Sequence, residues 1–166
     1  MSYPPGRPEE DGSTSAANLG PRLLAKLVDF VILWVVYAIV VFPFFVDPML
    51  DVSALDVGFS ASAFVAGLIS FALYLAYFIV LEMTTGQTLG KKVLKLRVYG
   101  PAGGYPTFEQ ALRRNGWMIL GIVPVLGTLA VLAAGVFILV TISNNTATRQ
   151  GWHDEFAGGT YVVRQS

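Results

Sequence analysis

Three charged residues lie close together at the start of the first apolar segment of the chain. Arg22, Lys26 and Asp29 fall within eight positions, and an apolar run then continues to Val46. On a helix, Arg22 and Asp29 would lie about 20° apart around the axis and roughly 10 Å apart along it. An aspartate in a membrane helix costs about 2.5 to 3.5 kcal/mol on insertion scales, so it should face a partner or a wet cavity. These residues could form an ion or proton site, or bind a polar ligand.

A purely structural arrangement explains the same residues. In it, Arg22 and Lys26 extend to cytoplasmic phosphates while Asp29 pairs with Lys26, three positions earlier. Asp154 follows the last apolar segment, and it could either neutralise Arg22 or remain a solvated residue beside Glu155. We predict a polar cluster formed by Arg22, Asp29 and Asp154, with Lys26 as a secondary member.

The composition indicates a membrane protein. Hydrophobic residues make up 54% of the chain and charged residues only 13%, which is too apolar for a water-soluble domain. Eleven basic residues balance eleven acidic ones, so no excess charge points to nucleic acid. Cysteine is absent and His153 is the single histidine, a poor ligand set for zinc. No Ser-His-Asp arrangement is evident. We expect no enzyme activity, no metal and no cofactor.

The elements that position the cluster are predicted to form an all-α membrane bundle with three to four transmembrane helices. Residues 1–20 are rich in Pro, Gly and acidic side chains and are expected to be a disordered tail, followed by a membrane domain over residues 21–166. Pro43 should bend or end the first helix. The predicted spans cover residues of about 23–46, 60–82 and 125–143, with a partial span at 107–123.

The distribution of basic residues predicts the membrane topology. The interval 82–116 contains six Lys or Arg residues and two Glu, so it should be cytoplasmic, with the N-terminus on the same side. The uncharged stretch 115–148 allows a single tilted helix over 117–142, or a hairpin that turns at 124–127. We favour the hairpin because it returns Arg149 and Arg164 to the basic side.

Two short segments have the pattern of strands. Residues 94–99 alternate between apolar and polar side chains, and residues 160–164 have strand propensity. We predict that they pair into a two-stranded cytoplasmic β element, a pairing that only the hairpin topology allows. Thr107 and Gln110 match a capping box at the start of a helix.

The segment 86–92, with the sequence GQTLGKK, superficially resembles a phosphate-binding loop. A nucleotide loop needs four residues between its glycines, a Ser or Thr after the Lys, and a helix after the loop, none of which fits here. We predict instead a tight turn that sets Lys91 and Lys92 at lipid headgroups. Small residues of the second span, from Ser62 to Ser70, suit close helix packing within one chain, or else a dimer face.

Four motifs in order resemble the RDD family of small membrane proteins. They are residues 22–29 (RLLAKLVD), 86–98 (GQTLGKKVLKLRV), 111–115 (ALRRN), and 152–154 (WHD) followed by 157–163 (AGGTYVV). On this resemblance the residues that give the family its name are Arg22, Asp29 and Asp154. The doubled glycine at 158 and 159 departs from the single glycine expected there.

The resemblance implies a membrane protein, which we expect to be a multi-pass protein of the bacterial inner membrane. The distribution of basic residues, with the hairpin, predicts that both termini are cytoplasmic. For such proteins transport is the suggested role, here cation/proton coupled and requiring an oligomer. The alternative is a non-transporting scaffold or accessory subunit, whose basic cytoplasmic loop binds lipid or a partner. Expected partners are the bilayer, anionic lipid headgroups, and either further copies of the chain or another membrane protein.

Overall fold

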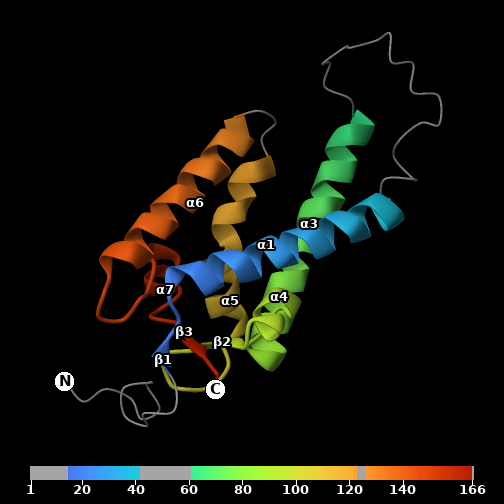
Figure 1. Cartoon of the computed structure of the whole chain (residues 1–166). Coiled ribbons are helices and arrows are strands. Elements are labelled where there is room, and N and C mark those ends of the chain that lie inside the picture. Colours follow the sequence, from blue (N-terminus) through green and yellow to red (C-terminus); the bar gives the residue numbers. More distant parts are fainter. Residues whose placement is uncertain (1–14, 42–60, 123–125, 166) are drawn as a thin grey trace.

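The computed structural model describes residues 15–41, 61–122 and 126–165, and it is mostly helical (Figure 1). Pro43, the first loop and the turn around Pro124 lie outside these residues. The helices are α1 (Leu19–Val36), the π-helix η1 (Tyr37–Val41), α3 (Ala61–Thr85), α4 (Leu89–Val93), α5 (Phe108–Asn115), the 3-10 helix η2 (Gly116–Ile122), α6 (Leu126–Asn144) and α7 (Trp152–Phe156). The strands are β1 (Ser15–Ala16), β2 (Leu96–Tyr99) and β3 (Tyr161–Arg164).

The two longest helices are apolar on their outer surfaces. Within the described residues, the segment Gly67–Thr85 of α3 is the one helix that is long and apolar enough to cross a membrane, and α6 contains a shorter apolar stretch, Leu129–Asn144. Twenty-five residues give α3 a length of about 37 Å, more than a hydrocarbon core of about 30 Å. Leu132 of α6 and Leu73 of α3 are among the exposed side chains. The helices thus expose the apolar surface expected of a helical membrane protein.

The segment after α5 forms two arms that lie side by side. Figure 1 shows η2 and α6 as neighbours, and a Cβ on Gly127 of α6 would overlap the Leu120 carbonyl oxygen of η2. The single continuous helix over residues 117–142 is therefore wrong: η2 is a 3-10 helix and α6 is a separate α-helix. The capping box at the start of α5 is confirmed, since Thr107 accepts from the Gln110 amide and Gln110 accepts from the Thr107 amide.

A small antiparallel sheet collects segments from both ends of the chain. The strand order is β1-β3-β2, with Leu96 opposite Arg164 and Tyr99 opposite Tyr161. Leu96 and Val98 are buried on one face of β2, as the alternation of the sequence predicts. The element has three strands where two were expected, because the backbone before α1 pairs with the outer edge of β3.

The N-terminal segment explains that third strand. The Ala17 amide donates to the Val162 carbonyl at 2.9 Å, and the Ala17 side chain is buried in the core under the sheet. The disordered tail predicted over residues 1–20 therefore does not extend through its last six residues, which form β1, a two-residue link and the first two residues of α1. The small side chains of Ala16 and Ala17 allow this backbone to pack closely on β3. Composition alone does not reveal this contact.

Helix α1 is polar toward the protein and apolar toward the outside. Ala25 and Asp29 are fully buried, whereas the opposite face exposes Leu27, Val31 and Trp34, the last to 71%. Figure 1 shows α1 crossing α3 rather than running parallel to it. A helix with its charges inside and its leucines outside is stable only where lipid or protein covers the outer face. This inverted arrangement agrees with a membrane location and creates the charged interior described next.

Candidate functional site

The carboxylate of Asp29 joins α1 to the segment after α3. It accepts hydrogen bonds from the Tyr77 hydroxyl at 2.6 Å, the Thr88 hydroxyl at 2.6 Å and the Gly90 amide at 2.7 Å. The Tyr77 oxygen also accepts from the Leu89 amide at 3.0 Å. Three donors satisfy most of the lone pairs of a fully buried carboxylate, so Asp29 is stable there without a cation beside it.

The residues of the 86–92 segment explain why this contact forms. Gly86 has φ +69°, a conformation that favours glycine, and its carbonyl accepts from the Val98 amide of β2. Thr88 caps α4 by accepting from the Lys91 amide. A Cβ on Gly90 would overlap the Ala25 carbonyl oxygen and lie 2.9 Å from the Asp29 Cγ. The two glycines therefore let this turn approach β2 and α1 closely, a packing role that needs no phosphate.

A second carboxylate, Asp154 of α7, is held by two arginines. Arg22 of α1 lies 3.0 Å from it, and Arg114 of α5 donates to its other oxygen. The Gly151 amide, at the start of α7, donates to Asp154 at 3.1 Å. Burial alone would raise the pKa of Asp154, but Arg114 and Arg22 hold it well below its usual range. Asp154 is thus an anion at neutral pH, and it attaches α7 to α1 and α5.

The third buried carboxylate, Glu82, lies at the C-terminal end of α3. Lys91 of α4 donates to one of its oxygens, and the side-chain Nδ2 of Asn115 donates to the other at 3.1 Å. The Arg114 Nε lies 3.5 Å from the same second oxygen. Burial lowers the pKa of Lys91 below its ordinary value, and the Glu82 carboxylate opposes that effect. Glu82 connects α3 to α4 and α5.

Arg114 connects the contacts of Glu82 to those of Asp154. Its guanidinium reaches both Glu82 and Asp154, and it also donates to the Thr160 hydroxyl at 2.9 Å. A planar guanidinium with five donors can bridge two carboxylates in this way, whereas an ammonium on the same stem cannot. We use the term buried charge network for the ion-paired set Arg22, Glu82, Lys91, Arg114 and Asp154 together with Asp29, which is bonded to α3 and α4 but forms no ion pair with that set within the described residues.

Lys26 lies beside this network without joining a carboxylate. Its ammonium is 3.5 Å from the centroid of the Phe78 ring, a cation–π contact. Within the described residues, Lys26 forms no ion pair with Asp29, although the two are three positions apart on one helix. Among the described residues, Lys26 is therefore a partly buried cation of this region that forms no ion pair with a carboxylate.

The predicted site is partly brought together. Arg22 and Asp154 are in direct contact, as the cluster requires, while Asp29 bonds to Tyr77, Thr88 and Gly90 instead of to either of them. The placement of Lys91 at lipid headgroups is wrong, because this side chain is buried against Glu82; Lys92 is exposed. Neither the solvated role for Asp154 nor the Asp29–Lys26 pair is found.

Sequence reasoning assigned no role to Glu82, Arg114, Asn115, Tyr77 or Thr88. One signal could have found Glu82: a lone acidic residue at the end of a long apolar segment needs a buried partner. Arg114 shows no such signal, because Arg113 beside it has the same type and is an exposed partner of Glu109. Only the phase of α5, which buries Ala111, Arg114 and Asn115, separates the two arginines.

The contacts of the buried charge network connect elements of the fold to one another. Its carboxylates are occupied by donors of the chain itself, and within the described part of the chain no group of three or more His, Asp or Glu side chains could hold a metal ion. An apolar exterior with charges paired inside is consistent with a small helical membrane protein. The family comparison agrees: the model of the RDD family matches residues 16–158, and the chain belongs to that family. No curated protein and no solved structure matches it.

Proposed function

We propose that the protein is a non-enzymatic membrane scaffold or accessory subunit, whose buried charge network holds a rigid cytoplasmic end. The observation that carries this proposal is that each buried carboxylate is bound by donors from two other elements. Asp29 of α1 is bound from α3 and α4, Glu82 of α3 from α4 and α5, and Asp154 of α7 from α1 and α5. The five helices α1, α3, α4, α5 and α7 are thereby joined through charged groups.

Such a network suits a structural role energetically. Removing one partner of a buried ion pair costs about 3 to 5 kcal/mol because the remaining charge is left unpaired. An ion carrier would need at least one carboxylate that exchanges its partners for a passing ion. Here the carboxylates already have short contacts to donors that cannot leave, such as the Gly90 and Gly151 amides.

We place the protein in the bacterial inner membrane as a multi-pass protein with both termini cytoplasmic. The spans would be those of the sequence prediction, with η2 as the partial arm. Support comes from the sheet, in which Ser15 near the N-terminus lies opposite Arg164 near the C-terminus. Reporter fusions at each terminus test this topology: both should report the cytoplasm, and a periplasmic C-terminus would contradict it.

Cation/proton coupled transport by an oligomer is the second candidate, and Lys26 is the observation that favours it. A partly buried ammonium close to the Asp29 and Glu82 carboxylates, yet paired with neither of them, could give up and regain a proton as an ion passes. The scaffold proposal is preferred because this feature concerns one side chain, whereas the paired contacts involve every element of the network.

A flux measurement separates the two candidates. Purified protein is reconstituted into liposomes that contain a pH-sensitive dye, and a sodium or potassium gradient is applied. The scaffold proposal expects the dye response of empty liposomes. An ion-driven pH change that is lost in Lys26→Met, but kept in the exposed control Lys92→Met, would overturn it in favour of transport.

A cellular assay supplies the positive test of the scaffold. The phenotype of a deletion strain should be restored by the Lys26→Met variant, which leaves the network contacts in place, and not by Arg114→Met, which breaks two of them. Restoration by Arg114→Met at normal protein levels would show that the network is dispensable, and it would contradict the proposal.

A further inference from the structure

Three short helices lie at the end of the molecule that carries the sheet (Figure 1). Each of them presents a pair of apolar residues on its exposed side. Each pair is spaced four residues apart, which places both members on one face of a helix. The pairs lie on α4, α5 and α7, next to points where longer helical segments begin or end. We call these six side chains the collar: Leu89 (44% exposed), Val93 (67%), Phe108 (57%), Leu112 (37%), Trp152 (41%) and Phe156 (54%).

The collar does not serve the internal packing of the protein. Helices of five to eight residues are unstable by themselves and depend on contacts made by their inner faces. Those inner faces are polar or small: Gly90 and Lys91 on α4, and Asp154 on α7. The apolar side chains therefore point away from the network, and an environment outside the chain must cover them.

The α7 pair has the chemistry of a membrane interface. The Trp152 ring stacks on Phe156, with centroids 5.3 Å apart and planes at 11°, and it meets the edge of Phe137 on α6 at 6.1 Å. The Trp152 amide donates to the Thr141 hydroxyl at 3.0 Å, which fixes α7 against the end of α6. Tryptophan prefers the headgroup level, where its ring is in contact with acyl chains and its N–H with water.

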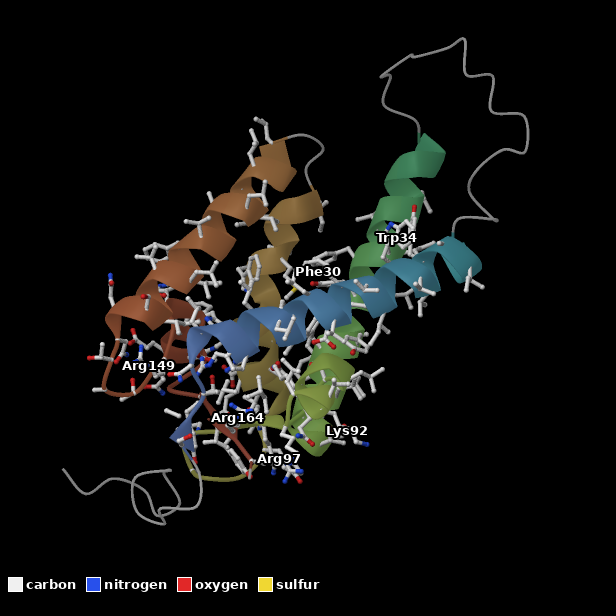
Figure 2. All side chains as sticks on the ribbon, in the orientation of Figure 1. Phe30, Trp34, Lys92, Arg97, Arg149 and Arg164 are labelled. Atoms are coloured by element: carbon white, nitrogen blue, oxygen red, sulfur yellow. The ribbon has the colours of Figure 1, made fainter. Side chains whose placement is uncertain are left out.

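The charges around the collar favour anionic lipid as the surface that covers it. Lys92 lies on α4 between Leu89 and Val93, and Lys95 lies two residues after the end of that helix. Both lysines are exposed. Figure 2 shows Lys92, Arg97 and Arg164 at the same end of the molecule. The exposed acidic residues on the short helices are Glu109, which pairs with Arg113, and Glu155. Unpaired cations therefore predominate beside the apolar pairs, a combination that binds anionic bilayers.

We propose that the collar lies in the headgroup region of the bilayer leaflet on the sheet side, with Lys92 and Lys95 contacting the phosphates of anionic phospholipids. This inference goes beyond the scaffold proposal, because it concerns an outer surface and not the buried charge network. Either can fail while the other holds: the first depends on ion pairs inside the chain, the second on contact with lipid.

Tryptophan quenching tests the depth of α7. The variant Trp34→Phe/Trp117→Phe keeps Trp152 as its single tryptophan. It is placed in phosphatidylcholine bilayers that contain about 30% phosphatidylglycerol to supply anionic lipid. Phospholipids brominated near the glycerol end of the acyl chain should quench Trp152 more than those brominated near the methyl end. Quenching by aqueous iodide, with none from brominated lipid, would overturn the proposal. If the variant does not fold, the loss of lipid quenching in Trp152→Phe gives the same information.

Lipid selectivity tests the two lysines. Raising the phosphatidylglycerol content should raise the thermal midpoint of the native protein in nanodiscs, and Lys92→Gln/Lys95→Gln should lose at least half of that shift. The control Glu109→Gln/Arg113→Gln removes an exposed pair with no net charge and should keep the full shift. An unchanged shift in the lysine variant, or an equal loss in the control, would show that these lysines do not bind anionic lipid.

Discussion

The Asp29 carboxylate accepts a hydrogen bond of 2.7 Å from the Gly90 amide, although the two residues are 61 positions apart. This contact requires a close approach of α4 to the backbone of α1, which is possible because Gly90 has no side chain. A buried aspartate of an apolar helix is thus satisfied by a turn of the chain and not by a cation. The finding separates the residues that give the family its name into two structural centres, one at Asp29 and one at Asp154.

Gly90→Ala should be the most damaging single methyl addition in the segment 86–92. Its Cβ would overlap the Ala25 carbonyl oxygen, so α4 would have to move away from α1 and break the bond to Asp29. We expect a loss of about 3 kcal/mol in the free energy of unfolding, the upper range of overpacking effects. Gly135→Ala is the matched control, because nothing lies within 4 Å of its Cβ. Equal thermal midpoints for the two variants in detergent would contradict this packing.

The Thr88 hydroxyl has two partners, which predicts a difference between two conservative substitutions. It donates to Asp29 at 2.6 Å and accepts from the Lys91 amide at 3.3 Å. Thr88→Val keeps the shape but loses both bonds, and should cost about 2 kcal/mol, since a buried carboxylate loses a donor. Thr88→Ser keeps the hydroxyl and should cost less than about 1 kcal/mol. Denaturant titration in detergent measures both, and a serine variant as unstable as the valine variant would point to packing instead.

The sequence predicts the elements of this fold better than the contacts between them. The alternation of apolar and polar side chains over residues 94–99 indicates a strand, because this pattern depends only on neighbouring positions along the chain. The contact of Arg22 with Asp154 could be anticipated from family resemblance and topology together. The partners of Asp29 could not be anticipated, because Tyr77, Thr88 and Gly90 show no pattern that indicates a buried contact. The turn at Gly86 brings Thr88 and Gly90 back beside Tyr77 and α1. Their role depends on three-dimensional packing, which periodicity does not encode.

Arg114→Lys should destabilise the protein, although it preserves the charge. One ammonium cannot reach both Glu82 and Asp154 in the way the guanidinium does, so one buried carboxylate loses a partner. We expect a cost of about 3 kcal/mol, the lower limit for breaking a buried pair. Arg113→Lys is the adjacent control, and its exposed pair with Glu109 should contribute less than about 1 kcal/mol. Chemical unfolding of both variants tests the bridge, which an equal effect of the two substitutions would rule out.

The stability of the protein should fall between pH 7 and pH 5 because of His153. Burial, followed by the nearby Arg114 and Arg22, lowers the pKa of this imidazole from 6.5 to about 3, despite the opposing charge of Asp154. The histidine is then neutral in the folded protein but becomes protonated in the unfolded chain below pH 6.5. The unfolded state binds more protons, so the free energy of unfolding decreases as the pH falls, by about 2 kcal/mol at pH 5.

The assignment of this slope to one residue is unusually direct. His153 is the single histidine of the chain, and the stabilising contribution of Asp154, whose pKa lies below its usual range, is lost only below about pH 4. His153→Gln should therefore remove most of the decrease between pH 7 and pH 5 while leaving the decrease below pH 4. Thermal midpoints measured by circular dichroism at fixed ionic strength test both windows. A slope that persists unchanged in His153→Gln would mean that another group, such as the Lys26 ammonium or a carboxylate of the network, titrates near neutral pH, which is the behaviour that transport would need.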